Sequence, residues 1–369
     1  MKILILGGTG AMGKSLVRIL AQAGHNVTVT SRSSHSLILS NINYVKGNAR
    51  ELTFLKKILS HHWDVIVDFM TYSTSEFQGR YKLLLTSTNQ YIFLSSSRVY
   101  ADSPLLDEKS PRLLETTNDQ EYLKTDEYAL AKARQETILE KSTYSNWVIV
   151  RPYITYSEER LQLGVFEKED WLYRALHGRQ IVFSRDIGRC YTTMTLGLDV
   201  AKGIASVVGK KSANKEIFQI TASKAYLWQD ILNLYISTLS KHNNLCIKVH
   251  WIDQMTTLSQ VMQNQYQVNM DRLCNRRFQS RKIQCFCDNR LNFEDLECAL
   301  PYCLDSFLLS PHFRKIDWGT QAHMDKLSQE FTPMCEIPSL KDKIKYMLFR
   351  YLPVGIPLKL RAIIQQLSQ

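Results

Sequence analysis

The chain has 369 residues, of which 44% are hydrophobic and 22% charged, so it is long enough for two domains around a buried core. These values exclude a disordered chain, collagen and a small disulfide scaffold. No run of about 18 uncharged apolar residues predicts a transmembrane helix. The apolar run at residues 3–6 is too short for the core of a secretory signal, so we expect a cytoplasmic protein.

The net charge of +11 favours an anionic partner, such as a nucleotide, a nucleic acid or a membrane surface. The charge is uneven, because residues 1–50 contain lysines and arginines but no acidic residue. All eight cysteines lie at or after Cys190, and none forms a Cys-x-x-Cys pair. This spacing predicts neither a redox motif nor a zinc site, so we expect no metal.

Strand-like and helix-like segments alternate along the first half of the chain. The alternation predicts parallel strands covered by helices on both faces, an α/β doubly wound parallel sheet of the Rossmann type. Thr125 is the expected N-cap of the third helix. The predicted strands are 2–8, 25–32, 63–70, 90–97 and 146–153, and the predicted helices are 12–23, 52–60 and 125–141. Further on, 216–220 resembles a strand and 228–240 a helix.

A glycine-rich loop, GGTGAMGKS at residues 7–15, follows the first strand and opens the first helix. Gly7, Gly10 and Gly13 allow a tight turn and a close backbone approach to a pyrophosphate, which the helix N-terminus then attracts. We therefore predict dinucleotide contacts at these glycines and at Ala11 and Met12 between them.

The same loop also fits a second motif. Gly8, Gly13, Lys14 and Ser15 match the P-loop of nucleotide triphosphatases, and Asp68 at the end of a later strand would then bind magnesium. The loop alone leaves both interpretations open.

Four further motifs follow the later strands, where open α/β sheets bind their ligands. These are SSSRVY at 95–100, Tyr128 with Lys132 on one helix face, RPYITY at 151–156 and TLGLDVAKGI at 195–204. Together with the glycine loop, they resemble the extended short-chain dehydrogenase/reductase family, the NAD(P)-dependent epimerase/dehydratase group. The resemblance covers roughly residues 1–240.

The resemblance implies hydride transfer between a nicotinamide ring and a carbon that bears a hydroxyl or carbonyl group. Tyr128 would be the general acid/base, and Lys132 would lower its pKa and hold the nicotinamide ribose. Ser96 would hydrogen-bond the substrate oxygen, with Ser97 as the alternative. The sugar dehydratases of the family have Asp and Glu where this chain has Ser97 and Arg98, so dehydration is disfavoured and an epimerase or a reductase is expected.

The end of the second strand carries Ser31 and Arg32 where NAD enzymes have an acidic residue. We therefore expect NADP(H) to be preferred over NAD(H). By the resemblance, Asn48 takes the place of an Asp that contacts adenine.

The resemblance also implies a nucleotide-activated sugar as the substrate. Its phosphates favour arginines, and we predict Arg151, Arg185 and Ser97 as substrate-binding residues. The basic residues at 272–282 would cluster if that segment is helical. A homodimer is compatible with the family, and no DNA partner is expected.

We predict three parts in the chain. Residues 1–155 would form the Rossmann NAD(P)-binding core. Residues 156–300 would form a smaller C-terminal α/β substrate-binding region, interleaved with the last sheet strands. Residues 301–369 would be an extension that ends in a basic amphipathic tail.

Two alternatives stay open. The basic charge and the superfamily's resemblance to chloroplast stem-loop RNA-binding proteins are compatible with an RNA-binding, catalytically weak member. The tail at 341–369 has a net charge of +5 and regularly spaced apolar residues, so it could lie on an anionic membrane surface or pack on its own domain. Pro353 and Pro357 divide it, so one continuous helix is not expected.

Overall fold

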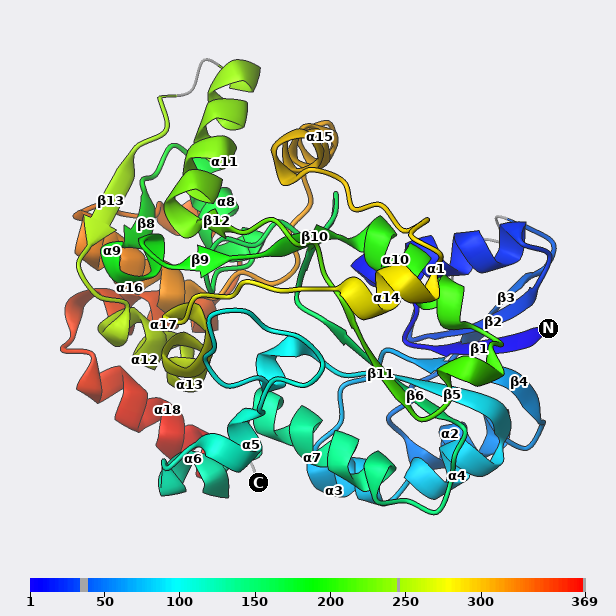
Figure 1. Ribbon diagram of the computed structural model, residues 1–369. Coiled ribbons are helices and arrows are strands. Elements are labelled where there is room, and N and C mark those ends of the chain that lie inside the picture. The colour runs from blue at the N-terminus through cyan, green and yellow to red at the C-terminus, as the bar shows by residue number, and fades with distance from the viewer. Residues whose placement is uncertain (34–38, 244–245, 368–369) are drawn as a thin grey trace. The chain divides into compact units, whose positions relative to one another are not determined.

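The computed structural model describes residues 1–33, 39–243 and 246–367, and they form two compact units (Figure 1). Unit 1 contains residues 1–159, 193–225 and 276–300, and unit 2 contains 160–192, 226–275 and 301–369. The chain leaves unit 1 after Glu159, returns to it twice, and leaves it for the last time after Leu300.

A seven-stranded sheet forms the centre of unit 1, in the order β11-β6-β5-β4-β1-β2-β3. All neighbouring strands run parallel. The order from β3 to β6 is that of a dinucleotide-binding sheet, which confirms the predicted doubly wound fold. The strands are β1 (Lys2–Leu6), β2 (Asn26–Ser31), β3 (Ile42–Lys46), β4 (Trp63–Asp68), β5 (Thr88–Leu94), β6 (Trp147–Pro152) and β11 (Glu216–Ile220).

Helices cover both faces of this sheet because each inner strand is apolar on both sides. In β1, Ile3 and Ile5 belong to one core, and Leu4 and Leu6 belong to the core on the opposite face. The first core includes α1 (Ala11–Gln22) and α10 (Gly197–Val207). The second includes α2 (Leu52–Ile58), α4 (Tyr81–Thr86) and α7 (Tyr128–Glu140). Unit 1 is therefore a three-layer α/β domain.

Shorter elements complete unit 1. They are α3 (Thr74–Gln78), the 3₁₀ turns η1 (Ser97–Val99) and η2 (Lys211–Ala213), α5 (Leu113–Thr116), α6 (Gln120–Lys124), the paired strands β7 (Ile154–Tyr156) and β10 (Met194–Leu196), and α14 (Arg281–Phe286). Helix α15 (Leu296–Leu308) crosses the change of unit at residue 300.

Unit 2 is smaller and mostly helical, with two strand pairs, β8 with β13 and β9 with β12. One of its apolar cores contains Tyr173, Trp318, Ala322, Tyr346 and Phe349. Its elements are α8 (Lys168–Leu176), β8 (Ile181–Ser184), α9 (Arg185–Gly188), β9 (Tyr191–Thr192), β12 (Tyr226–Leu227), α11 (Trp228–Asn243), β13 (Val249–Ile252), α12 (Thr256–Met262), α13 (Gln265–Gln267), the π-helical turn η3 (Val268–Arg272), α16 (Trp318–Ser328), η4 (Met334–Glu336), α17 (Leu340–Tyr351) and α18 (Gly355–Leu367).

Residues 272–282 do not form one helix. The basic cluster that such a helix would create is therefore absent from this segment. Residues 273–280 are not helical, and the chain changes unit within them. Arg272 is buried and donates to the Gly164 carbonyl at 2.8 Å, whereas Arg276 is buried and donates to the Tyr100 and Ala101 carbonyls. Both guanidinium groups are thus held by backbone carbonyls distant in the sequence, and Arg272 also pairs with Asp271.

No helix in the described ranges is both long and apolar enough to cross a membrane. As expected from its two prolines, the tail forms two helices, α17 and α18.

Candidate active site

The glycine loop forms a tight turn between β1 and α1. Gly7 has a φ of +72°, which favours glycine, and its N–H donates to the Thr30 hydroxyl at 3.0 Å. A Cβ on Gly13 would lie 2.5 Å from the carbonyl oxygen of Gly8. Only glycine at position 13 therefore lets the helix pack this closely against the turn.

The N-terminus of α1 is open for a ligand. Gly10 is the N-cap and provides no side chain to the free N–H groups of the first turn, where Ala11 and Met12 lie. That turn contains no acidic residue, and a Cβ on Gly10 would meet nothing within 4 Å. Uncapped N–H groups, positive helix dipole and open space together fit a pyrophosphate.

The two residues that a P-loop would need have other partners. Lys14 forms an ion pair with Glu159. Asp68 is fully buried and accepts hydrogen bonds from the Tyr91 hydroxyl at 2.8 Å and the Met70 N–H at 2.9 Å. Its pKa is raised because burial penalises the charged carboxylate, although these bonds oppose the shift. A buried, hydrogen-bonded carboxyl group is unsuited to hold magnesium for a triphosphate.

The predicted ribose and adenine contacts lie near the ends of β2 and β3. The Ser31 hydroxyl accepts from the N–H of Ser33 at 3.1 Å, and the Arg32 side chain is exposed. Asn48 follows β3, and its amide bridges Glu51 and the N–H of Arg50. Its side chain already has these local partners, whereas Arg32 is open to an anion.

The serine cluster forms the η1 turn directly after β5. Ser96 is the N-cap of this turn, and its hydroxyl oxygen accepts from the N–H of Arg98 at 3.2 Å, which leaves its proton available to donate. The Ser97 hydroxyl is fully buried and donates to the Arg151 carbonyl at 3.0 Å. Ser96 therefore keeps a hydrogen for a substrate oxygen, whereas Ser97 holds two segments together.

Helix α7 starts at Tyr128, and its N-cap is Glu127, not Thr125 as predicted. Glu127 accepts from the N–H of Ala129 at 2.8 Å, whereas Thr125 is the C-cap of α6. A carboxylate at this end of a helix is favoured by the helix dipole, which explains the later start.

Arg98 joins the serine turn to the start of α7, a link that the sequence analysis missed. Its guanidinium forms an ion pair with Glu127 at 2.5 Å and lies over the Tyr128 ring, 5.2 Å from the ring centroid. Helix α7 packs against the η1 turn. Ser96 and Tyr128 are thereby brought to the same edge of the sheet.

Lys132 lies one helical turn after Tyr128 and is buried at the carboxyl ends of β4 and β5. Its amine donates to the Leu94 carbonyl at 2.7 Å and approaches the Met70 carbonyl at 3.4 Å. Burial lowers the lysine pKa to about 8, and the nearby carboxylates of Asp68 and Glu136 counteract part of this shift. The amine is therefore poised to titrate near neutral pH.

Met70 connects this lysine to the glycine turn. A Cβ on Gly7 would lie 2.8 Å from the Met70 sulfur, so the Met70 side chain packs directly on the glycine turn. Within the described residues, the Tyr128 hydroxyl has no hydrogen bond to Ser96 or Lys132. The hydroxyls of Tyr128 and Ser96 can therefore still bond a ligand, whereas the Lys132 amine is already bonded to backbone carbonyls.

Arg151 has a different environment from the one predicted. It is buried and pairs with Glu136 through two hydrogen bonds of 2.9 and 2.7 Å, and it approaches the Glu108 carbonyl at 3.3 Å. Burial favours the neutral carboxyl group of Glu136, but Arg151 and Arg112 more than offset this and hold its pKa below the usual range. The arrangement indicates a structural role for Arg151, and the Ser97 hydroxyl that donates to its carbonyl shares that role.

Arg185 lies in unit 2 at the start of α9. Its side chain is half exposed, 3.6 Å from Asp253 and over the Trp251 ring. This loose pair leaves the guanidinium accessible to an anion.

Comparisons with known proteins agree with this geometry. The chain is 28% identical over 238 residues to the chloroplast stem-loop binding protein of 41 kDa b from Arabidopsis thaliana, which is 60% of this chain and 59% of the relative. The chain therefore spans about three fifths of that relative's length.

Solved structures show the same fold. An epimerase from Methanothermobacter thermautotrophicus aligns with a TM-score of 0.65 at 14% identity, over 83% of this chain and 92% of that one. UDP-glucuronic acid 4-epimerase from Bacillus cereus, in complex with UDP-glucuronic acid and NAD, aligns with a TM-score of 0.64 at 15% identity. The alignment covers 84% of this chain and 99% of that one.

The model of the NAD dependent epimerase/dehydratase family matches residues 3–220, more than half of the chain. The match includes the glycine turn, the serine turn and the Tyr128–Lys132 helix described above. The chain therefore belongs to the NAD dependent epimerase/dehydratase family, a family of NAD-dependent enzymes.

Proposed function

We propose that this protein binds a nicotinamide dinucleotide and catalyses epimerisation or oxidoreduction at a hydroxyl or keto carbon of a nucleotide-activated sugar. One observation supports this most strongly. The Met70 side chain packs against Gly7 of the glycine turn and its carbonyl lies 3.4 Å from the Lys132 amine, which supports a dinucleotide that reaches from this turn to the proposed proton-transfer residues.

Each residue has a distinct part in the proposed reaction. The nicotinamide supplies the hydride chemistry when the dinucleotide is bound. Ser96 donates its hydroxyl hydrogen to the reacting substrate oxygen, and Tyr128 takes the proton from that oxygen or returns it. Lys132, mostly protonated at pH 7 with a pKa of about 8, favours the tyrosinate and holds the nicotinamide ribose.

Dehydration is not part of this proposal. The residues after Ser96 are Ser97, whose hydroxyl holds the Arg151 carbonyl, and Arg98, which pairs with Glu127. Neither is a carboxylic acid that could protonate a leaving hydroxyl group. The similarity to a UDP-glucuronic acid 4-epimerase suggests the substrate class.

NADP(H) differs from NAD(H) by the 2′-phosphate on the adenosine ribose. Exposed Arg32 and the Ser31 hydroxyl would accept a 2′-phosphate, which an acidic residue would repel. We propose that both cofactors bind and that NADPH binds more tightly. Replacing Arg32 with Gln should weaken NADPH binding by about tenfold, because one charged contact is lost, and leave NADH binding within about twofold.

The catalytic test is turnover of the full chain with UDP-glucuronic acid and related nucleotide sugars, followed by separation of the products. We expect Tyr128→Phe to reduce the rate by roughly 10²- to 10⁴-fold with unchanged NADH affinity. Tyr144→Phe is the matched control, because Tyr144 is also half-buried but lies just before the amino end of β6. Equal turnover of Tyr128→Phe and Tyr144→Phe would exclude Tyr128 as the acid/base.

RNA binding is a second candidate, favoured by the similarity to a stem-loop binding protein and by the net charge of +11. It predicts affinity for a stem-loop RNA that falls steeply with salt. The two functions separate cleanly, because Gly13→Ala would abolish dinucleotide binding and leave RNA affinity unchanged.

A further inference from the structure

Helix α17 carries an apolar row on its solvent side as well as on its buried side. Its buried residues, Tyr346 and Phe349, pack into the apolar core of unit 2. The exposed apolar row repeats at helical spacing and consists of Leu340, Ile344, Met347 and Tyr351, which are 74%, 53%, 43% and 58% exposed. One such residue would be ordinary, but four in a row on a single face call for a partner.

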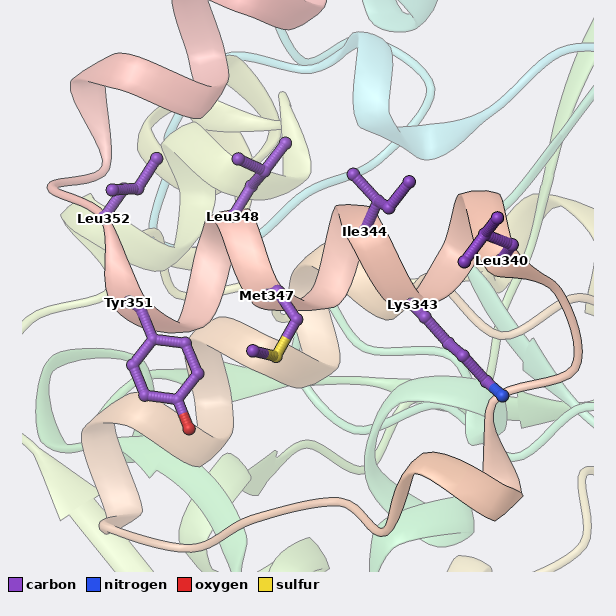
Figure 2. Close-up of a pocket in the computed structure, with 7 residues that line it drawn as sticks. All are labelled: Leu340, Lys343, Ile344, Met347, Leu348, Tyr351 and Leu352. Atoms are coloured by element: carbon purple, nitrogen blue, oxygen red, sulfur yellow. The ribbon is translucent and has the colours of Figure 1, made fainter.

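The side chains form a shallow groove along the helix. Figure 2 shows two rows, one of Leu340, Ile344, Leu348 and Leu352 and the other of Lys343, Met347 and Tyr351. The groove runs the length of α17, and Lys343 is its one charged side chain.

Basic residues accompany the apolar row. Lys341 and Lys343 have no ion-pair partner among the described residues, and neither has Lys359 on α18. By contrast, Lys345 pairs with Asp317, and Arg350 donates to the Glu330 carbonyl. The positive charge beside the exposed row is therefore uncompensated.

The next helix continues the same pattern. On α18, Ile356 and Leu360 are 45% and 41% exposed, four residues apart, with exposed Lys359 between them. Residues 355–367 contain no acidic residue. Arg361 donates to the Val261 carbonyl at 3.2 Å and so ties the middle of this helix to unit 2.

We propose that α17 and α18 form a docking surface for an anionic lipid bilayer. The exposed apolar row would enter the boundary between headgroups and acyl chains, and Lys341, Lys343 and Lys359 would contact the lipid phosphates. Tyr351 suits this boundary because its ring is apolar and its hydroxyl is polar. The lysine stems would extend so that their amines reach the headgroups.

Charge argues against a second copy of the chain as the occupant. A two-fold contact would bring identical surfaces together, and with them the uncompensated lysines of both copies. The one acid on α17, Asp342, already accepts a hydrogen bond from the Ser339 hydroxyl at 2.6 Å. An anionic bilayer supplies the negative charge that a second copy lacks.

The test is sedimentation of the full chain with vesicles of phosphatidylcholine alone and of phosphatidylcholine mixed with phosphatidylglycerol. We expect binding to the mixed vesicles only. Binding should weaken at least tenfold in the double variant Ile344→Ser/Met347→Ser. Leu309→Ser is the matched control, because Leu309 is 83% exposed in unit 2 but lies outside both helices, and it should bind like the wild type.

A second variant, Lys341→Gln/Lys343→Gln, keeps the apolar row and should weaken binding by roughly thirtyfold, as should high salt. Unchanged thermal unfolding would show that the variants are folded. The proposal fails if the wild type does not sediment with the mixed vesicles, or if both double variants bind as well as the control. It also fails if the wild type is a dimer that Ile344→Ser/Met347→Ser makes monomeric, since the occupant would then be a second copy.

Discussion

The two halves of helix α7 place buried charges in opposite situations. In the second half, Glu136 is buried between Arg151 and Arg112, and both guanidinium groups donate to its carboxylate. In the first half, Lys132 is equally buried, but its amine bonds only to backbone carbonyls. The difference shows which charge stabilises the fold and which can take part in chemistry. The Glu136 carboxylate, held by two guanidinium groups, keeps its charge, whereas the Lys132 amine, hydrogen-bonded to backbone carbonyls, has its pKa lowered to about 8.

Replacing Glu136 with Gln should have the largest effect on stability. It leaves Arg151 buried without a counter-charge, so the free energy of unfolding should fall by about 3 to 5 kcal/mol. Urea denaturation measures this change. A loss below about 1 kcal/mol would show that the paired half of α7 is not a structural anchor.

Lys132→Met should have a smaller effect with a distinct pH dependence. Burial lowers the lysine pKa from 10.5 to about 8, so the unfolded chain binds more protons than the folded one between these values. The stability of the wild type should therefore rise relative to Lys132→Met as the pH rises from about 8 to 10.5, by on the order of 3 kcal/mol. Urea denaturation of both proteins across this range gives the difference, and a constant difference would contradict the assigned pKa.

The same pKa predicts a limit on activity. If the Lys132 ammonium favours the tyrosinate and holds the ribose, kcat/KM should decline as the pH rises past about 8. A profile that stays level to pH 10 would remove this role from Lys132.

Arg98→Met should have the smallest effect. The guanidinium is partly buried, and its pair with Glu127 should contribute about 1 kcal/mol or less to stability. Because Arg98 lies over the Tyr128 ring, it is a positioning residue. We expect a drop in kcat without a change in NADH affinity, and Lys at this position should restore part of it. An unchanged kcat would show that the contact with Tyr128 does not matter.

The sequence predicted most of the sheet because its inner strands are short runs of apolar residues between helices. The edge strand β3 was not predicted, since INYVK mixes polar and apolar residues and of its five residues only Ile42 is buried. Ser96, Tyr128 and Lys132 were predicted from their motifs, and they stay a prediction. The partners of Arg151 were not, because Glu136 lies on a helix fifteen residues away and no local spacing marks the pair.

The most direct test of the account is a side-by-side fluorescence titration of the full chain with NADPH, NADH and ATP. The open N-terminus of α1 and the glycine turn predict that both dinucleotides bind and that ATP binds weakly, with or without magnesium. Gly13→Ala, whose Cβ would meet the Gly8 carbonyl, should abolish this binding, and Gly10→Ala, whose Cβ would enter the open space proposed for the pyrophosphate, should weaken it. Tight, magnesium-dependent binding of ATP without either dinucleotide would contradict the account.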